Sequence, residues 1–244
     1  MKLYDMHCHI DLMPSMTTFA NDALNDNICI LTVTTTPKAY TKEISMLRSF
    51  PNIRVALGLH PQLVSERYAE LALVEKYIIE AGYVGEVGLD FNKHFFDSKG
   101  KQIDVFDNII NWCGKQSNKI ISIHSVHAAK EVLDILEKHS CAEHNRCILH
   151  WFSGTLGQLQ RGVEMGCLFS INSAMLKSLN GQKIISKIPS KNILIESDAP
   201  FVEEISSVKR LRNELTVVST KLATFFDDSL LPDIQNRSAY LLAM

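Results

Sequence analysis

Short apolar runs alternate along the chain with longer segments in which apolar residues recur every three or four positions. The runs predict eight strands: Leu3–His9, Ile28–Thr34, Ile53–His60, Tyr83–Val87, Ile120–His124, Cys147–His150, Cys167–Ile171 and Ile193–Glu196. The periodic segments predict seven helices: Thr41–Ser49, Ala69–Ala81, Lys101–Lys115, Ala128–Lys138, Leu156–Gly166, Gly181–Ile188 and Leu211–Phe226. This alternation is typical of parallel α/β folds, and eight strand–helix units favour a closed (β/α)₈ TIM barrel. An open doubly wound sheet is the competing architecture, but no Gly-x-Gly-x-x-Gly turn follows the first predicted strand.

Length and composition restrict the class of protein. At 244 residues, with 46% hydrophobic and 21% charged residues, the chain can form one large core, so we expect a single domain over residues 1–244. The formal net charge of −2 excludes a global positive field that would attract duplex DNA or anionic lipid. Any recognition of phosphate must therefore be local.

The spacing of the cysteines and the residues at the start of the chain predict the cellular compartment. The six cysteines form no C-x-x-C pair, so we expect buried, reduced thiols. Polar groups interrupt Met1–His9, where a secretory signal needs an apolar stretch, and no run of apolar residues is long enough to span a membrane. These features predict a cytoplasmic protein without a membrane partner.

Histidines and carboxylates gather where the predicted strands end. Alternation along the first strand puts Asp5, His7, His9 and Asp11 on one face. Five further residues lie at or just after the ends of later strands: His60, Glu86, His124, His150 and Asp198. Because the carboxyl ends of barrel strands meet at one mouth, we expect these side chains to converge there.

This set of side chains is suited to two divalent metal ions. Mixed imidazole and carboxylate ligands favour zinc, manganese, iron or cobalt, whereas magnesium usually takes oxygen ligands alone. The sequence does not determine which of these five metals is bound. Glu86 is the expected bridge, because it lies between the first histidine pair and the later histidines. Asp198 is expected to bind metal and to accept a proton from the attacking water.

The same residues, read in order, resemble the TatD-like metal-dependent deoxyribonucleases of the amidohydrolase superfamily. The resemblance spans nearly the whole chain and rests on these segments: His7-x-His9-x-Asp11, Gly58-Leu59-His60-Pro61, Gly85-Glu86-Val87-Gly88-Leu89-Asp90, Ser122-Ile123-His124-Ser125, His150-Trp151-Phe152-Ser153-Gly154 and Glu196-Ser197-Asp198-Ala199-Pro200. It implies one metal held by His7, His9, Glu86 and Asp198, and a second held by Glu86, His124 and His150. It also implies that His60 lies over the phosphate of a DNA substrate.

Four segments are similar, more narrowly, to the TatD-type subunits of the Qat anti-phage defence system. They are Thr34-Thr35-Thr36-Pro37, the stretch Ala56 to Leu63, the stretch Ile148 to Gly154, and Ser173-Ala174-Met175-Leu176. This similarity implies an antiviral role with other Qat proteins as partners, among them an ATPase and a protein resembling a queuosine-synthesis enzyme.

The chain departs from the family pattern beside the predicted site. Val126 occupies the place of a common arginine, so a phosphate contact is missing unless His127 supplies it. The usual proline-rich segment after Pro200 is also absent, and Phe201–Arg212 stands there instead. Trp151 is a candidate for stacking on an unpaired base, although it and Phe152 are equally suited to packing under the loops.

We therefore expect hydrolysis of DNA phosphodiester bonds at single-stranded ends, with His60, Trp151 and His127 binding substrate. A barrel mouth favours a frayed end, because a duplex is too wide to lower its backbone into a pocket. Two alternatives remain open. One is an amidohydrolase acting on a cyclic amide, lactone or phosphotriester, although many of these bridge their metals with a modified lysine where this chain has Glu86. The other is a metal-loaded, non-catalytic subunit whose partners supply the activity.

Overall fold

The computed structural model describes residues 2–226 and 229–243, and all eight expected strands are present in that part. The strands are β1 (Leu3–Cys8), β2 (Ile28–Val33), β3 (Ile53–Ala56), β4 (Tyr83–Asp90), β5 (Ile120–Val126), β6 (Arg146–His150), β7 (Leu168–Ile171) and β8 (Ile193–Ile195). β3 is shorter than expected, so His60 lies in the loop beyond it, whereas β4 and β5 continue past Val87 and His124.

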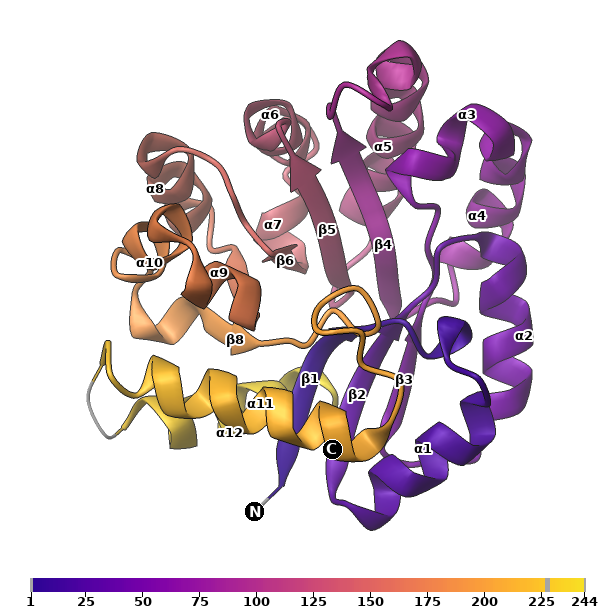
Figure 1. Cartoon of the computed structure of the whole chain (residues 1–244). Helices are drawn as coiled ribbons and strands as arrows, with labels where there is room; N and C mark the ends of the chain where they lie inside the picture. Colours follow the sequence, from indigo (N-terminus) through magenta and orange to yellow (C-terminus); the bar gives the residue numbers. More distant parts are fainter. Residues whose placement is uncertain (1, 227–228, 244) are drawn as a thin grey trace.

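The strands are parallel and close into a barrel in two arcs. One arc has the order β1-β2-β3 and the other β4-β5-β6-β7-β8. Single backbone bridges join the arcs, between Leu57 and Val84 on one side and between Cys8 and Ala199 on the other. The expected single-domain (β/α)₈-type fold is thus confirmed (Figure 1).

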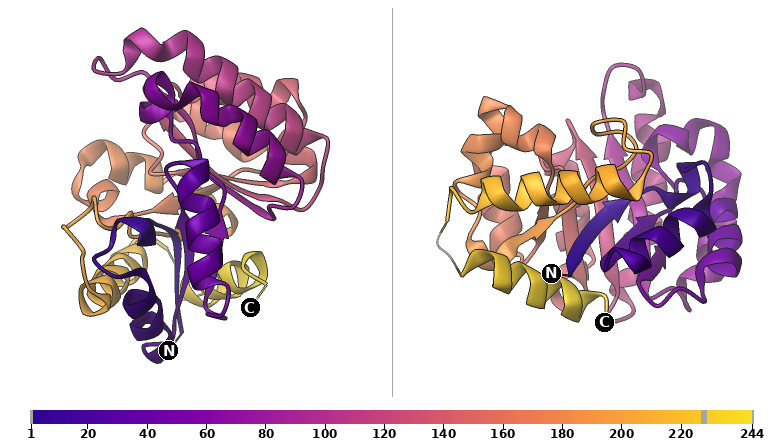
Figure 2. Two further views of the ribbon diagram at one scale, coloured as in Figure 1. Left: turned by 90° about the vertical axis from the view of Figure 1, so that its right-hand side faces the viewer. Right: turned by 60° about the horizontal axis from the view of Figure 1, so that its bottom comes forward.

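Helices surround the strands (Figure 2). The helices are α1 (Met16–Asn25), α2 (Pro37–Leu47), α3 (Val64–Arg67), α4 (Leu71–Ile78), α5 (Lys99–Gly114), α6 (Ala129–Lys138), α7 (Cys141–His144), α8 (Leu156–Glu164), α9 (Ser173–Lys177), α10 (Leu179–Ile185), α11 (Val208–Leu222) and α12 (Leu230–Leu241). None of those within residues 2–226 and 229–243 is long and apolar enough to cross a membrane.

Five of these helices were not expected from the sequence, and others begin at different residues. α1 was missed because its buried stripe consists of Met16, Phe19 and two alanines, a weak apolar signal. α2 begins four residues before the expected Thr41, because Thr36 caps its first turn by accepting from Ala39 N, and Pro37 fits the first helical position. α3, α7, α9 and α12 were also missed, the first three because they are only four or five residues long.

The core has two parts. One cluster draws buried side chains from strands all around the barrel, including Met6, Leu31, Ile148 and Leu194, and fills its interior. The larger cluster packs the helices on the outside of the strands. All six cysteines are buried and free, as expected. This packing fixes the strands, whose carboxyl ends carry the polar side chains described next.

Candidate metal centre

His7 and His9 lie at the carboxyl end of β1, where the strand is irregular. The pairing register between β1 and β2 shifts between Asp5 and Cys8, and β1 ends at Cys8, so simple alternation does not continue to His9 and Asp11. His9 is held instead by its backbone N–H, which donates to Ala199 O at 2.8 Å. Asp11 lies in a short 3₁₀ turn beyond the strand, so the alternation on which its expected place beside His7 rested does not apply to it.

Glu86 enters the centre from β4, where two backbones approach closely. Its N–H donates to Thr34 O at 3.1 Å, at the end of β2. Gly58 allows this contact, because a Cβ there would lie 1.8 Å from Thr34 O and 2.6 Å from Glu86 N. Without a side chain at residue 58, the end of β2 can pack against the middle of β4 and hold Glu86 at 2% exposure.

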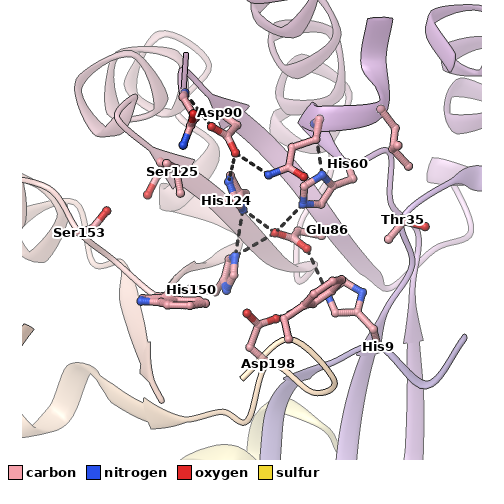
Figure 3. A pocket seen from close by; sticks show the side chains of 16 residues that line it. His9, Thr35, His60, Glu86, Asp90, His124, Ser125, His150, Ser153 and Asp198 are labelled. Carbon is pink, nitrogen blue, oxygen red and sulfur yellow. Dashed lines mark hydrogen bonds and ion pairs between the residues drawn. The ribbon is translucent and has the colours of Figure 1, made fainter. Parts of the chain in front are cut away.

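Five imidazoles surround the Glu86 carboxylate, and its two oxygens divide them into two sets. Oε2 lies 3.4 Å from His7 Nε2 and 3.3 Å from His9 Nε2. Oε1 lies 3.2 Å from His60 Nε2, 2.7 Å from His124 Nδ1 and 2.9 Å from His150 Nε2. Figure 3 shows four of these rings pointing at the carboxylate.

The spacing in the first set fits one metal ion. Two donors that each lie about 2.1 Å from a tetrahedral ion are about 3.4 Å apart. Asp198 Oδ1 lies 3.7 Å from His7 Nε2 and 3.6 Å from His9 Nε2, close to the separations from Glu86 Oε2. His7 Nε2 is also buried without a hydrogen-bond partner, as expected for a nitrogen that serves as a ligand.

The second set offers another group of donors around Oε1. His124 Nδ1 and His150 Nε2 are 3.3 Å apart, and both lie within 2.9 Å of that oxygen. His124 Nε2 lies 3.1 Å from Asp90 Oδ2, so Asp90 can hold the Nε2 proton and leave Nδ1 as the nitrogen that would bind an ion. Burial opposes ionisation of Asp90, but hydrogen bonds from His124, Gln62 and Asn92 hold its pKa at about 2.

His60 is presented differently from the other four histidines. Its Nδ1 accepts a hydrogen bond from the backbone N–H of Gln62 at 3.2 Å. Burial lowers the pKa of His60 despite the nearby Glu86, so the ring is neutral and its proton is on Nε2. The nitrogen that faces the pocket is therefore a donor, although spacing alone would also group His60 with Glu86 and His124 around an ion.

The electrostatics of the centre favour added positive charge. Burial lowers the pKa of His9, but Asp198 and Glu86 outweigh it and raise that pKa to about 10. Burial would raise the pKa of Glu86, yet His60, His150 and His7 hold it well below its ordinary value. The buried carboxylates thus remain ionised and require cations, whether imidazole protons or metal ions. In donor type and charge the residues could hold metal ions, and the spacing of the first set fits one ion.

Several supporting residues were not assigned a role from the sequence. Ser122 Oγ lies 2.8 Å from His7 Nδ1 and orients that ring. Glu196 Oε1 lies 3.6 Å from His150 Nδ1, and Asn172 Nδ2 donates to the same oxygen at 2.9 Å. Asp5, which strand alternation puts on the same face as His7, accepts from the backbone N–H of Ser197 at 2.9 Å and so anchors the segment before Asp198. The sequence pattern does not indicate that a serine or asparagine in or next to a strand will form a hydrogen bond to a ligand side chain.

A cavity of about 430 Å³ opens over the centre. Among the described residues, its lining contains no lysine or arginine, and it includes Val126, Trp151 and Phe201. His127 lies outside it, in a neighbouring groove of about 350 Å³ that shares Ser125 and Ser153 with the main cavity.

Comparisons with known proteins identify the family of this chain. Residues 4–227 match the model of the family described as TatD related DNase. The chain is 26% identical to human deoxyribonuclease TATDN3 over 231 residues, covering 87% of this chain and 82% of that protein. It is 24% identical over 216 residues to the Escherichia coli protein YjjV, named an uncharacterized metal-dependent hydrolase, covering 82% of this chain and 80% of that one.

Solved structures share the fold. The crystal structure of Escherichia coli YjjV, described as a TatD homolog, superposes with a TM-score of 0.83 at 20% identity, covering 98% of this chain and 97% of the other. A TatD family hydrolase from Entamoeba histolytica gives 0.78 at 16% identity, covering 100% and 97%. From the family match over nearly its whole length, this chain belongs to the TatD family of metal-dependent hydrolases and deoxyribonucleases, enzymes that act on ester bonds.

Proposed function

We propose that the centre hydrolyses phosphodiester bonds in DNA with two divalent ions. The observation that carries the proposal is the Glu86 carboxylate, whose two oxygens each face a separate set of imidazoles. In enzymes of this kind, two bound ions polarise the phosphate and make water a better nucleophile. The cavity above the carboxylate provides room for the reacting phosphate.

Each side chain has a separate task in this proposal. One ion would be held by His7, His9, Glu86 and Asp198, and the other by Glu86, His124 and His150. The Asp198 carboxylate also accepts the proton of the attacking water. Burial raises its pKa, but His9, His7 and His150 lower it below the ordinary value, so the carboxylate is ionised and able to accept.

The cavity supports action at single-stranded ends. Its volume of about 430 Å³ is at the lower end of the range for small-ligand pockets, so it can accept a nucleotide-sized group but no duplex. The direct test is to incubate the purified protein with labelled single-stranded and double-stranded DNA and RNA, with each divalent metal and with chelator. We expect metal-dependent shortening of single-stranded DNA from an end. Cleavage in chelator, or none with any metal, would contradict the proposal.

His60 serves in this proposal as a hydrogen-bond donor to a phosphate oxygen. We expect His60→Ala to keep the wild-type metal content and to lower hydrolysis by about 10- to 100-fold, because a hydrogen bond to a charged group contributes about 1.5–3 kcal/mol. Metal analysis and initial rates on one preparation test this. Loss of one ion in the variant would make His60 a ligand and contradict the proton position inferred from Gln62.

Val126 leaves the cavity without a fixed cation beside the phosphate, and His127 in the adjoining groove is proposed to contact the strand instead. Val126→Arg is expected to tighten binding of plain single-stranded DNA. It should also make the slope of the logarithm of the binding constant against the logarithm of the salt concentration steeper, by the amount for about one additional phosphate contact. Fluorescence anisotropy over a series of salt concentrations measures both. Val126→Gln is the uncharged control. Weaker or unchanged binding in the arginine variant would mean that valine suits a different substrate.

The four segments that resemble Qat subunits favour a role in anti-phage defence together with other proteins of that system. We expect bacteria that carry the complete set of these proteins to lose phage protection when Glu86 is replaced by glutamine. Plaque counts on strains with wild-type and variant protein at equal abundance test this. Full protection by the variant would favour a binding role for this chain over a catalytic one.

A further inference from the structure

Two exposed aromatic side chains border the cavity over the metal centre. Trp151 is 37% exposed and Phe201 is 62% exposed, and both line the cavity. Phe152, the neighbour of Trp151, is 1% exposed and packs against Phe169 inside the protein. Only one of the two adjacent aromatic residues therefore contributes to the core, and the other is left at the cavity.

Both residues lie beside proposed metal ligands. Trp151 follows His150 at the end of β6 and has a left-handed backbone, with φ at +39°, which is uncommon for a residue other than glycine. The Phe201 N–H donates to Asp198 O at 2.9 Å, and its ring meets His9 edge to face at 5.1 Å between centroids. A group lying against either ring is thus next to the reacting phosphate.

The charges around the cavity leave few other means of holding a nucleotide. Within the described part of the chain, the cavity lining has carboxylates, imidazoles, amides and hydroxyls but neither lysine nor arginine. The phosphate itself would be held at the metal centre, which makes no contact with the base of the nucleotide. Aromatic side chains can bind unpaired bases, because every base has a π-face that can stack on them.

We propose that Trp151 and Phe201 bind the nucleobase of the terminal nucleotide whose phosphodiester bond is broken. This inference rests on the proposed function and adds a specificity to it. The enzyme selects strand ends that carry a base and is tolerant of which base it is. An abasic end lacks the stacking group and is a poor substrate.

Binding of the base can be measured without catalysis. The chain has two tryptophans, so Trp112→Phe leaves Trp151 as the only one. We expect thymidine monophosphate to quench the fluorescence of this variant and 2-deoxyribose 5-phosphate, which lacks a base, to leave it unchanged. Equal quenching by the two compounds, or none by the nucleotide at concentrations that inhibit hydrolysis, would contradict stacking on Trp151.

The deciding experiment compares two single strands, one normal and one with abasic residues at both ends. Wild-type protein is expected to cleave the normal strand about 10-fold faster or more, given the usual contribution of one stacked base. Trp151→Ala and Phe201→Ala should reduce this preference, and Trp151→Phe should retain part of it. Tyr240→Ala, on the exposed face of α12, is the matched control and should behave as wild type.

The outcomes separate this inference from the proposed function. Equal cleavage of both strands by wild-type protein overturns base stacking and leaves the phosphodiesterase function intact. If neither strand is cleaved but thymidine monophosphate still quenches Trp151 selectively, base binding is upheld and the proposed substrate is wrong.

Discussion

Replacing Glu86 by glutamine is expected to remove bound metal and to lower phosphodiester hydrolysis by about 10³-fold or more. Both oxygens of this carboxylate lie within 3.4 Å of imidazole nitrogens, so the loss of its charge affects both sets of ligands at once. Metal ions contribute several kcal/mol to charge stabilisation in the transition state, and each 1.36 kcal/mol corresponds to about tenfold in rate. Metal analysis and initial rates measure the two effects.

The control for this variant is Glu214→Gln, which changes another buried carboxylate, on α11 away from the centre. It should keep metal and activity. Circular dichroism should find the barrel folded in the Glu86→Gln variant, because residues at the loop face contribute little to the packed layers below. A Glu86→Gln protein with two bound ions and normal turnover would exclude the bridging role.

Replacing Asp198 by asparagine is expected to lower the rate of hydrolysis by about 10²–10⁴-fold, the range usual for loss of a general base. Asparagine keeps the shape and one ligating oxygen, but it cannot accept a proton. Substrate binding should survive, so KM should change much less than kcat. The measurement is made at saturating metal with occupancy determined on the same preparation. Near-normal cleavage at full occupancy would remove Asp198 from the proton transfer.

Strands were easier to predict from the sequence than helices. Most strands are short, largely apolar runs buried on both faces, a pattern that needs no knowledge of distant contacts. α1 is stabilised by the packing of two alanines, a methionine and a phenylalanine against neighbouring elements, which gives a weak apolar pattern. α2 begins at a polar N-cap residue, which a search for apolar periodicity does not detect. Such boundaries are decided by local hydrogen bonds and tertiary packing.

For the candidate site, the sequence indicated which residues converge but not how each one is presented. The positions of His7, Glu86 and Asp198 follow from barrel topology, because strand ends meet at one mouth. The proton on His60 Nε2 depends on a backbone N–H two residues away, and the orientation of His124 depends on a carboxylate from the neighbouring strand. Phe201 was missed because an aromatic residue in a loop gives no pattern of its own.

The central claim is that hydrolysis depends on two ions held around Glu86. Its most direct test is to strip the protein with chelator, add back manganese in steps, and follow cleavage of single-stranded DNA together with the number of ions bound per chain. We expect no cleavage in the stripped protein and full activity only when two equivalents are bound. Cleavage by the stripped protein, or full activity with a single equivalent, would contradict the claim.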